Sequence, residues 1–189
     1  TKPALSEPEF INFDGVGTLE AFNTDGLRTL LNLDIPHMAE KTLRYPGHID
    51  LMKTLRDAGF FSSDEIKLKG VNVRPVDVAG KILFPQWKYE EGEEDFTVMR
   101  VIVEGEEKGK QKRHTYDLFD RYSRETKTSS MARTTGYTAT AAANILLNNQ
   151  YKKKGIISPE MLGEETGCFD FILSYLKQRN VIYKLKEEA

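Results

Sequence analysis

The sequence predicts an α+β fold with a mixed, largely antiparallel sheet and helices on one face. Two observations support this prediction. Strand-like runs follow one another across short turns, both around Asp14-Gly15 and between residues 96–103 and 112–122, as in antiparallel hairpins. Helical periodicity comes in separate blocks, so the alternating β-α-β order of a nucleotide-binding domain is absent. The length of 189 residues fits one domain.

The expected elements of the first half begin or end at a recognisable signal, such as Gly59 after a helix. Leucines at helical spacing and β-branched runs fill the stretches between these signals. The elements are two strands within residues 9–22, a short helix opening at residues 23–26, a strand at 41–45, and helices at 48–58 and 76–83.

The second half starts with an acidic stretch at residues 89–95, for which we expect a solvated turn. Residues 96–103 form the strongest strand because they are largely β-branched, and residues 105–111 are expected to be a charged turn. The remaining elements are a strand at 112–122, a helix at 131–148, a short strand and helical turn at 155–160, a helix at 169–179 and a strand at 181–185.

Composition excludes several classes of protein. The net charge is −2, so no basic field would attract a nucleic acid. No apolar run reaches the roughly 18 residues of a membrane span, so we expect no membrane partner. The single cysteine, Cys168, favours a reducing, cytoplasmic compartment and is interpreted as a small core hydrophobe. Residues 1–8 carry no apolar signal core and no initiator Met, which indicates a chain cut from a longer protein.

Two sequence features that resemble known sites are given simpler interpretations. Gly15-Val16-Gly17 is predicted to be a turn, because a dinucleotide loop needs a third glycine and a following helix. The three histidines, His37, His48 and His114, lie far apart and lack the spacing of metal ligands. We therefore expect no metal site.

Two polar loops remain as candidate sites. His48 follows the turn Arg44-Tyr45-Pro46-Gly47, which is either a plain helix start or a loop that faces substrate or an interface. At residues 128–136, hydroxyl side chains precede a long helix. They either cap its free N–H groups or help the helix N-terminus bind a carboxylate or phosphate.

Five segments of the chain, in order, resemble the saccharopine dehydrogenase/L-lysine dehydrogenase family. They are spread from residue 19 to residue 160, so the match covers nearly the whole chain, and they resemble the C-terminal, non-Rossmann part of these enzymes. The segments are residues 19–28, residues 41–48, residues 55–61, residues 129–139 and residues 155–160.

The resemblance implies a fold and an activity. It implies an α+β substrate and dimerisation domain over residues 1–189, with a large mixed sheet similar to that of the C-terminal domain of glyceraldehyde-3-phosphate dehydrogenase. It also implies NAD- or NADP-linked hydride transfer at the C–N bond of an amino acid, saccharopine or lysine. The Rossmann domain is absent from this sequence, so we expect the chain alone to bind no cofactor and to be inactive.

Within the matched segments, four residues are expected to face the cleft or an interface: Arg44, Tyr45, His48 and Ser130. Residues 4–7 resemble the end of a substrate-contacting stretch. No catalytic residue can be assigned, because the family places its cleft Lys and Asp on the Rossmann side. Partners implied by the resemblance are an amino-acid substrate, the missing Rossmann domain and a second copy of the chain.

The alternative is a free-standing dimerisation or amino-acid-binding module without catalytic activity. A strand-Gly-x-Gly-x-x-Gly-helix pattern encoded upstream of Thr1 would favour the enzyme. A start codon near Thr1 would favour the module.

Overall fold

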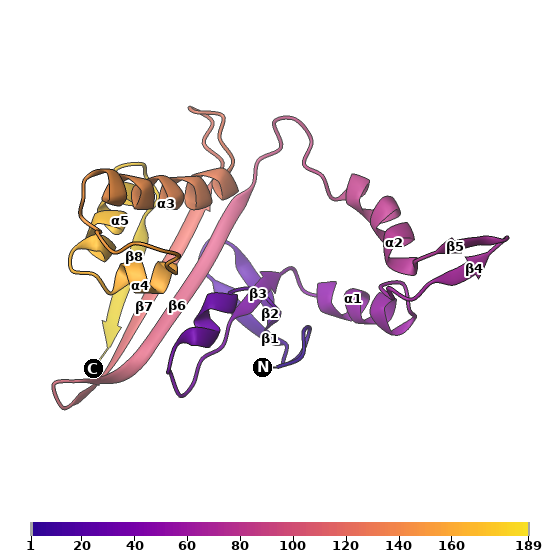
Figure 1. The fold of residues 1–189 in the computed structure, drawn as a ribbon, viewed down its shortest axis with the longest axis horizontal. Helices are drawn as coiled ribbons and strands as arrows, with labels where there is room; N and C mark the ends of the chain where they lie inside the picture. The colour runs from indigo at the N-terminus through magenta and orange to yellow at the C-terminus, as the bar shows by residue number, and fades with distance from the viewer. Residues whose placement is uncertain (1, 189) are drawn as a thin grey trace. The chain divides into compact units, whose positions relative to one another are not determined.

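The computed structural model describes residues 2–188 of the chain. These residues form two compact units, residues 2–89 and residues 90–188 (Figure 1). The described part is mixed α+β, with five α-helices and three small antiparallel sheets. The α+β class and the antiparallel pairing are therefore confirmed.

The first unit begins with a three-stranded sheet in the order β1-β2-β3. The strands are β1 (Glu9–Phe13), β2 (Gly17–Asn23) and β3 (Lys41–Arg44). Between β1 and β2 the N–H of Val16 donates to the carbonyl of Phe13 at 3.1 Å, and Gly15 has a φ of 77° that side chains rarely allow. The hairpin at Asp14-Gly15 is confirmed, and so is the turn interpretation of the two glycines around Val16.

Two of the helices predicted for the first unit, α1 and α2, are present as α-helices. The unit also contains one strand pair that the sequence did not reveal. The helix α1 (His48–Asp57) ends at Gly59, and α2 (Pro75–Leu83) continues into a 3-10 turn, η2 (Phe84–Gln86). The helix expected after residue 26 is only a 3-10 turn, η1 (Arg28–Asn32). The pair β4 (Ile66–Leu68) and β5 (Val71–Val73) was missed because three residues are too few to show a period.

The core of the first unit lies on β2. The side chains of Leu19, Ala21 and Phe22 are buried, as is Ile49 on α1, which packs against β2. The leucine face expected near η1 is not buried, since Leu31 is 66% exposed. No other element of the unit covers it.

The second unit is a three-stranded sheet, β6-β7-β8, with α3 and α5 packed on one face (Figure 1). The bounds are β6 (Phe96–Glu107), β7 (Lys110–Arg121), β8 (Tyr183–Glu188), α3 (Ser130–Leu147), α4 (Pro159–Gly163) and α5 (Cys168–Lys177).

Both long strands extend further than predicted, so the charged turn is not residues 105–111. It contains only Lys108 and Gly109, which have φ values of 53° and 77°, as a type I′ turn requires. That turn suits the right-handed twist of a hairpin, and the charged residues on either side continue the ladder as cross-strand ion pairs.

Two clusters of buried side chains join the sheet to the helices. Leu118 on β7 packs with Leu176 on α5 and with Val181. Cys168, which is 1% exposed, packs with Ile145 of α3 in the second cluster. The interpretation of Cys168 as a small core hydrophobe is confirmed.

Two expectations about the sheet are wrong. The described residues form three separate antiparallel sheets rather than one large mixed sheet. Residues 155–157 are a loop rather than a strand, because no sheet edge pairs with them, and Ile156 is fully exposed. The likeness to the C-terminal domain of glyceraldehyde-3-phosphate dehydrogenase stays a prediction.

We predict that Leu118→Ala destabilises the chain by about 2–5 kcal/mol, because it leaves a cavity between β7 and α5. Leu147→Ala is the matched control, since Leu147 is 77% exposed and should change stability by less than ~0.5 kcal/mol. Urea unfolding followed by circular dichroism measures both. Equal effects for the two substitutions would contradict the core assignment.

Candidate functional site

The loop between β3 and α1 carries three of the four residues predicted to face a cleft or an interface. The strand ends at Arg44, and the N–H of His48 donates to the carbonyl of Tyr45 at 3.3 Å. Gly47 precedes the helix with a φ of 93°, and a Cβ there would meet no atom within 4 Å. The glycine is therefore required by backbone conformation, not by crowding.

A buried carboxylate, which the sequence did not reveal, holds this loop in place. Glu20 lies on β2 directly opposite Arg44 and is 6% exposed. Its Oε2 accepts the N–H of Gly47 at 3.1 Å. The N–H groups at a helix start lack partners within the helix, so Glu20 satisfies one donor at the N-terminus of α1. The available signal was an acidic residue within the otherwise apolar run from Leu19 to Phe22.

The surroundings of His48 favour the neutral form of its imidazole. Partial burial lowers the pKa of His48 below its ordinary value, and the positive charge of Arg44 lowers it further, while Glu20 acts in the opposite direction. The ring stacks on Phe22, with 6.3 Å between the ring centroids. A neutral imidazole has one donor and one acceptor, so His48 suits hydrogen bonding to a polar ligand at neutral pH.

Arg44 and Tyr45 lie on the surface beside His48. Tyr45 is 64% exposed, and Arg44 is also exposed. One guanidinium nitrogen of Arg44 donates to the carbonyl of Leu43 at 2.8 Å, which fixes part of the side chain. An exposed guanidinium presents a fork of donors that matches a carboxylate. Arg44, Tyr45 and His48 supply a guanidinium, a phenol and an imidazole, which are groups that suit a ligand with a carboxylate and further polar groups.

The N-terminal segment is hydrogen-bonded to Asn23, the last residue of β2. The N–H of Leu5 donates to the carbonyl of Asn23 at 2.9 Å, and the N–H of Asn23 donates to the carbonyl of Ser6 at 3.1 Å. The buried side chain of Asn23 also donates to the hydroxyl of Ser6 at 2.9 Å. Residues 5 and 6 are therefore fixed on β2. Whether residues 4–7 contact substrate stays a prediction.

Ser130, the fourth predicted residue, lies in the interior of the second unit and not on a surface. Its side chain is fully buried. Its hydroxyl lies 2.8 Å from Asp120 and 2.9 Å from Thr97. Its N–H donates to Asp95 Oδ1 at 2.6 Å, and that of Met131 donates to Asp95 Oδ2 at 2.9 Å.

The start of α3 is therefore a capped helix, which decides between the two interpretations left open by the sequence. The Ser129 hydroxyl accepts the N–H of Ala132 at 3.1 Å, as an N-cap does. The carboxylate of Asp95 takes the place that an external anion would need. The expectation that residues 89–95 form a wholly solvated turn is wrong at Asp95, which is 7% exposed.

A buried ion pair completes this network. Arg133 donates to Asp120 Oδ1 at 3.1 Å and to the carbonyl of Arg179 at 3.0 Å. The side chains of Arg133 and Asp120 are 9% and 5% exposed. Removing one partner of such a pair leaves a buried charge and typically costs about 3–5 kcal/mol. Arg133 therefore stabilises the fold and is not available to an external anion.

The other two histidines belong to neither of these loops. His37 is exposed, and His114 on β7 has its Nδ1 at 3.3 Å from Glu187. Among residues 2–188, no three His, Cys, Asp or Glu side chains are placed to hold a metal ion. No helix in that range is both long and apolar enough to cross a membrane.

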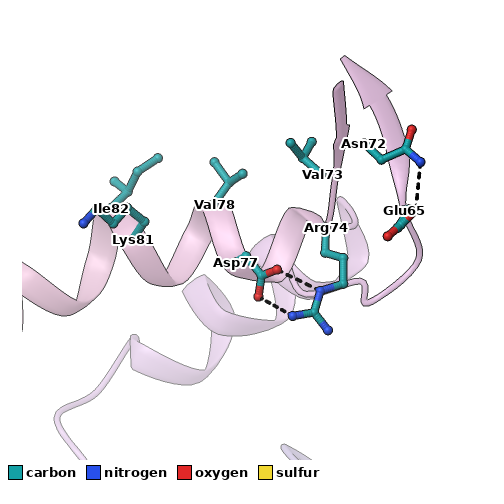
Figure 2. Close-up of a pocket in the computed structure, with 8 residues that line it drawn as sticks. All are labelled: Glu65, Asn72, Val73, Arg74, Asp77, Val78, Lys81 and Ile82. Atoms are coloured by element: carbon teal, nitrogen blue, oxygen red, sulfur yellow. Dashed lines mark hydrogen bonds and ion pairs between the residues drawn. The ribbon is translucent and has the colours of Figure 1, made fainter. Parts of the chain in front are cut away.

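A shallow pocket of about 390 Å³ lies between β5 and α2, away from the residues predicted from sequence (Figure 2). Its polar groups bind one another. Arg74 forms two hydrogen bonds with Asp77, at 2.7 and 3.0 Å, and Asn72 donates to Glu65 at 3.0 Å. Arg74 and Asp77 are thus already paired, and this pair is exposed to water, which makes it weak.

A family model describing the saccharopine dehydrogenase C-terminal domain matches residues 1–182. The chain belongs to this family, and the resemblance noted in the sequence is confirmed. The family implies a saccharopine or lysine dehydrogenase-type oxidoreductase, and its match runs through both compact units.

We predict that Asp95→Asn destabilises the chain by about 1–3 kcal/mol, because an amide has one oxygen where the carboxylate binds two N–H groups. Glu91→Gln is the control, since it neutralises an exposed acid in the same acidic stretch. Thermal and urea unfolding compare the two variants. An equal, small effect would show that capping by Asp95 contributes little.

Proposed function

We propose that this chain is the substrate-side domain of an NAD- or NADP-dependent dehydrogenase that acts on the C–N bond of saccharopine or lysine. The family supports the class of reaction. The exposed guanidinium of Arg44, beside Tyr45 and a neutral His48, supports the site. The proposal includes a cytoplasmic homodimer, with the single buried cysteine in favour of a reducing compartment.

In this proposal the loop binds and orients the amino-acid substrate. Arg44 pairs with a substrate carboxylate, since a guanidinium and a carboxylate form two parallel hydrogen bonds. His48 and Tyr45 contribute neutral hydrogen bonds. Glu20 holds the loop from inside through Gly47, so it is a positioning residue that does not touch the substrate. Substrate oriented in this way would present its C–N carbon to the cofactor, which supplies the hydride acceptor or donor when bound.

The turn at Gly15 and Gly17 and the starts of α1 and α3 do not fit a dinucleotide. A pyrophosphate usually binds the free N–H groups of a helix that follows a glycine-rich turn. The turn that contains Gly15 and Gly17 leads into a strand. The starts of α1 and α3 already bind the carboxylates of Glu20 and Asp95. No step through the cofactor is therefore assigned to residues of this chain.

We predict that the 189-residue chain binds neither NADH nor NADPH, because its glycine turn leads into a strand and the starts of α1 and α3 bind internal carboxylates. Fluorescence titration of the reduced nucleotides, with calorimetry as a second readout, measures this. Micromolar binding by the chain alone would contradict the assignment of the cofactor site to another domain.

We predict that saccharopine shifts the amide signals of residues 44–48 in NMR titrations of the chain. Arg44→Ala should weaken this binding at least about tenfold, which is the loss expected when a charge-assisted hydrogen bond is removed. Arg56→Ala is the matched control, because Arg56 is an exposed arginine on α1 that pairs with Asp57. Lysine is titrated in parallel to compare substrates.

Unchanged affinity in Arg44→Ala would contradict the proposed site. So would an equal loss in Arg56→Ala, because that result would indicate a general effect of positive charge. Perturbations confined to the second unit would move the site away from the loop.

A further inference from the structure

The backbone on either side of His48 is fixed from inside the first unit. The N–H of Gly47 donates to the buried Glu20 at 3.1 Å, and the N–H of His48 donates to the carbonyl of Tyr45 at 3.3 Å. The next residue, Ile49, is fully buried. With this backbone held, the freedom left to His48 is rotation about the two torsions of its side chain.

The ring of Phe22 limits that rotation. The Phe22 and His48 rings are stacked, with 6.3 Å between their centroids and 27° between their planes. Phe22 is 4% exposed, so its own ring is held by the packing of the unit. Aromatic pairs prefer such stacked arrangements, and a fixed ring beside the imidazole therefore favours one orientation of it.

Glu20 and Phe22 contact the loop from the same face of β2. Side chains two positions apart in a strand point to the same side of the sheet. Here they contact consecutive residues, since Glu20 binds Gly47 and Phe22 stacks on His48. β2 therefore holds the start of α1 at two points, through a hydrogen bond and through an aromatic ring.

The orientation of His48 matters because a neutral imidazole is not symmetric. One of its nitrogens donates a hydrogen bond and the other accepts one. The two nitrogens lie at different positions of the ring, so a ligand group in a given place meets the right nitrogen in only one orientation.

We propose that Phe22 is a positioning residue for His48, which fixes the plane of the imidazole in the orientation that a substrate at the loop meets. This inference rests on the proposed function, because it takes His48 to contribute a hydrogen bond to the substrate. Phe22 does not touch the substrate and acts through His48. The contacts that support it all lie within the first unit.

The charges around His48 act together with this ring. Burial lowers the pKa of His48, Arg44 on β3 lowers it further, and Glu20 on β2 raises it. Asp50 lies in the first turn of the same helix. The ring of Phe22 contributes to the burial, so its removal should let the pKa of His48 rise toward its ordinary value.

Phe22→Leu tests the positioning role in the 189-residue chain without a ligand. It keeps an apolar side chain in the core and removes the aromatic ring. NMR titration of the His48 ring protons measures their pKa, which should lie below the ordinary value of about 6.5 in the parent chain and rise toward it in the variant. Nuclear Overhauser effects between the Phe22 and His48 ring protons check the stacking in the parent chain itself.

Leu19→Val is the matched control. Leu19 is 5% exposed on β2, and its side chain points to the opposite face of the strand from Phe22. The substitution also removes a small volume of buried apolar side chain, but it should leave the pKa of His48 unchanged. Circular dichroism checks that both variants are folded.

A double-mutant cycle with saccharopine shows whether Phe22 acts through His48. His48→Ala should weaken binding about twofold to tenfold, which is the loss expected for one neutral hydrogen bond. Phe22→Leu should weaken binding in the parent chain and have no further effect in the His48→Ala variant.

A parent chain without the ring contact, or an equal pKa change in Phe22→Leu and Leu19→Val, would overturn the positioning role and leave the proposed function intact. Additive losses in the double-mutant cycle would do the same, because Phe22 would then affect binding by another route. Saccharopine that perturbs none of residues 44–48 would overturn the proposed function, and the pKa of His48 would still decide whether Phe22 positions its ring.

Discussion

The second unit depends on one contact, in which the carboxylate of Asp95 binds the N–H groups of Ser130 and Met131. Asp95 directly precedes β6, so this contact connects the start of the longest helix to the start of one of the two longest strands. In the same network Asp120 binds the side chains of Ser130 and Arg133. Arg133 also donates a hydrogen bond to the carbonyl of Arg179, which follows α5. A buried polar network is costly unless every member is satisfied, so these elements have one favourable arrangement.

In the first unit a carboxylate from a neighbouring strand also binds the N-terminus of a helix, through one hydrogen bond instead of two. Glu20, buried on β2, accepts the N–H of Gly47 and fixes the loop that precedes α1. Both units therefore satisfy a helix N-terminus with a carboxylate from a neighbouring strand. This has a functional consequence, because the N-termini of α1 and α3 bind internal carboxylates and are not open to a phosphate. The surface of the loop remains for a ligand, with an exposed Arg44 and a neutral His48.

Local signals explain which parts of the structure could be predicted from the sequence. The β1–β2 hairpin follows from Asp14-Gly15, the end of α1 from Gly59, and the β6–β7 pair from a β-branched run and its alternating partner. The burial of Cys168 followed from the apolar residues around it. The short pair β4–β5 could not be predicted, because its strands are too short for a period.

The sequence by itself indicated the class of fold and the family, and it singled out the turn at residues 44–48, because each of these inferences rests on short segments of neighbouring residues. Only the tertiary structure decided the role of Ser130, since its partners Asp95 and Thr97 come from more than 30 positions away. It also showed that Glu20 is buried under the loop and that the strands form three separate sheets. Burial and long-range hydrogen bonding depend on which elements pack together, and no local pattern encodes that choice.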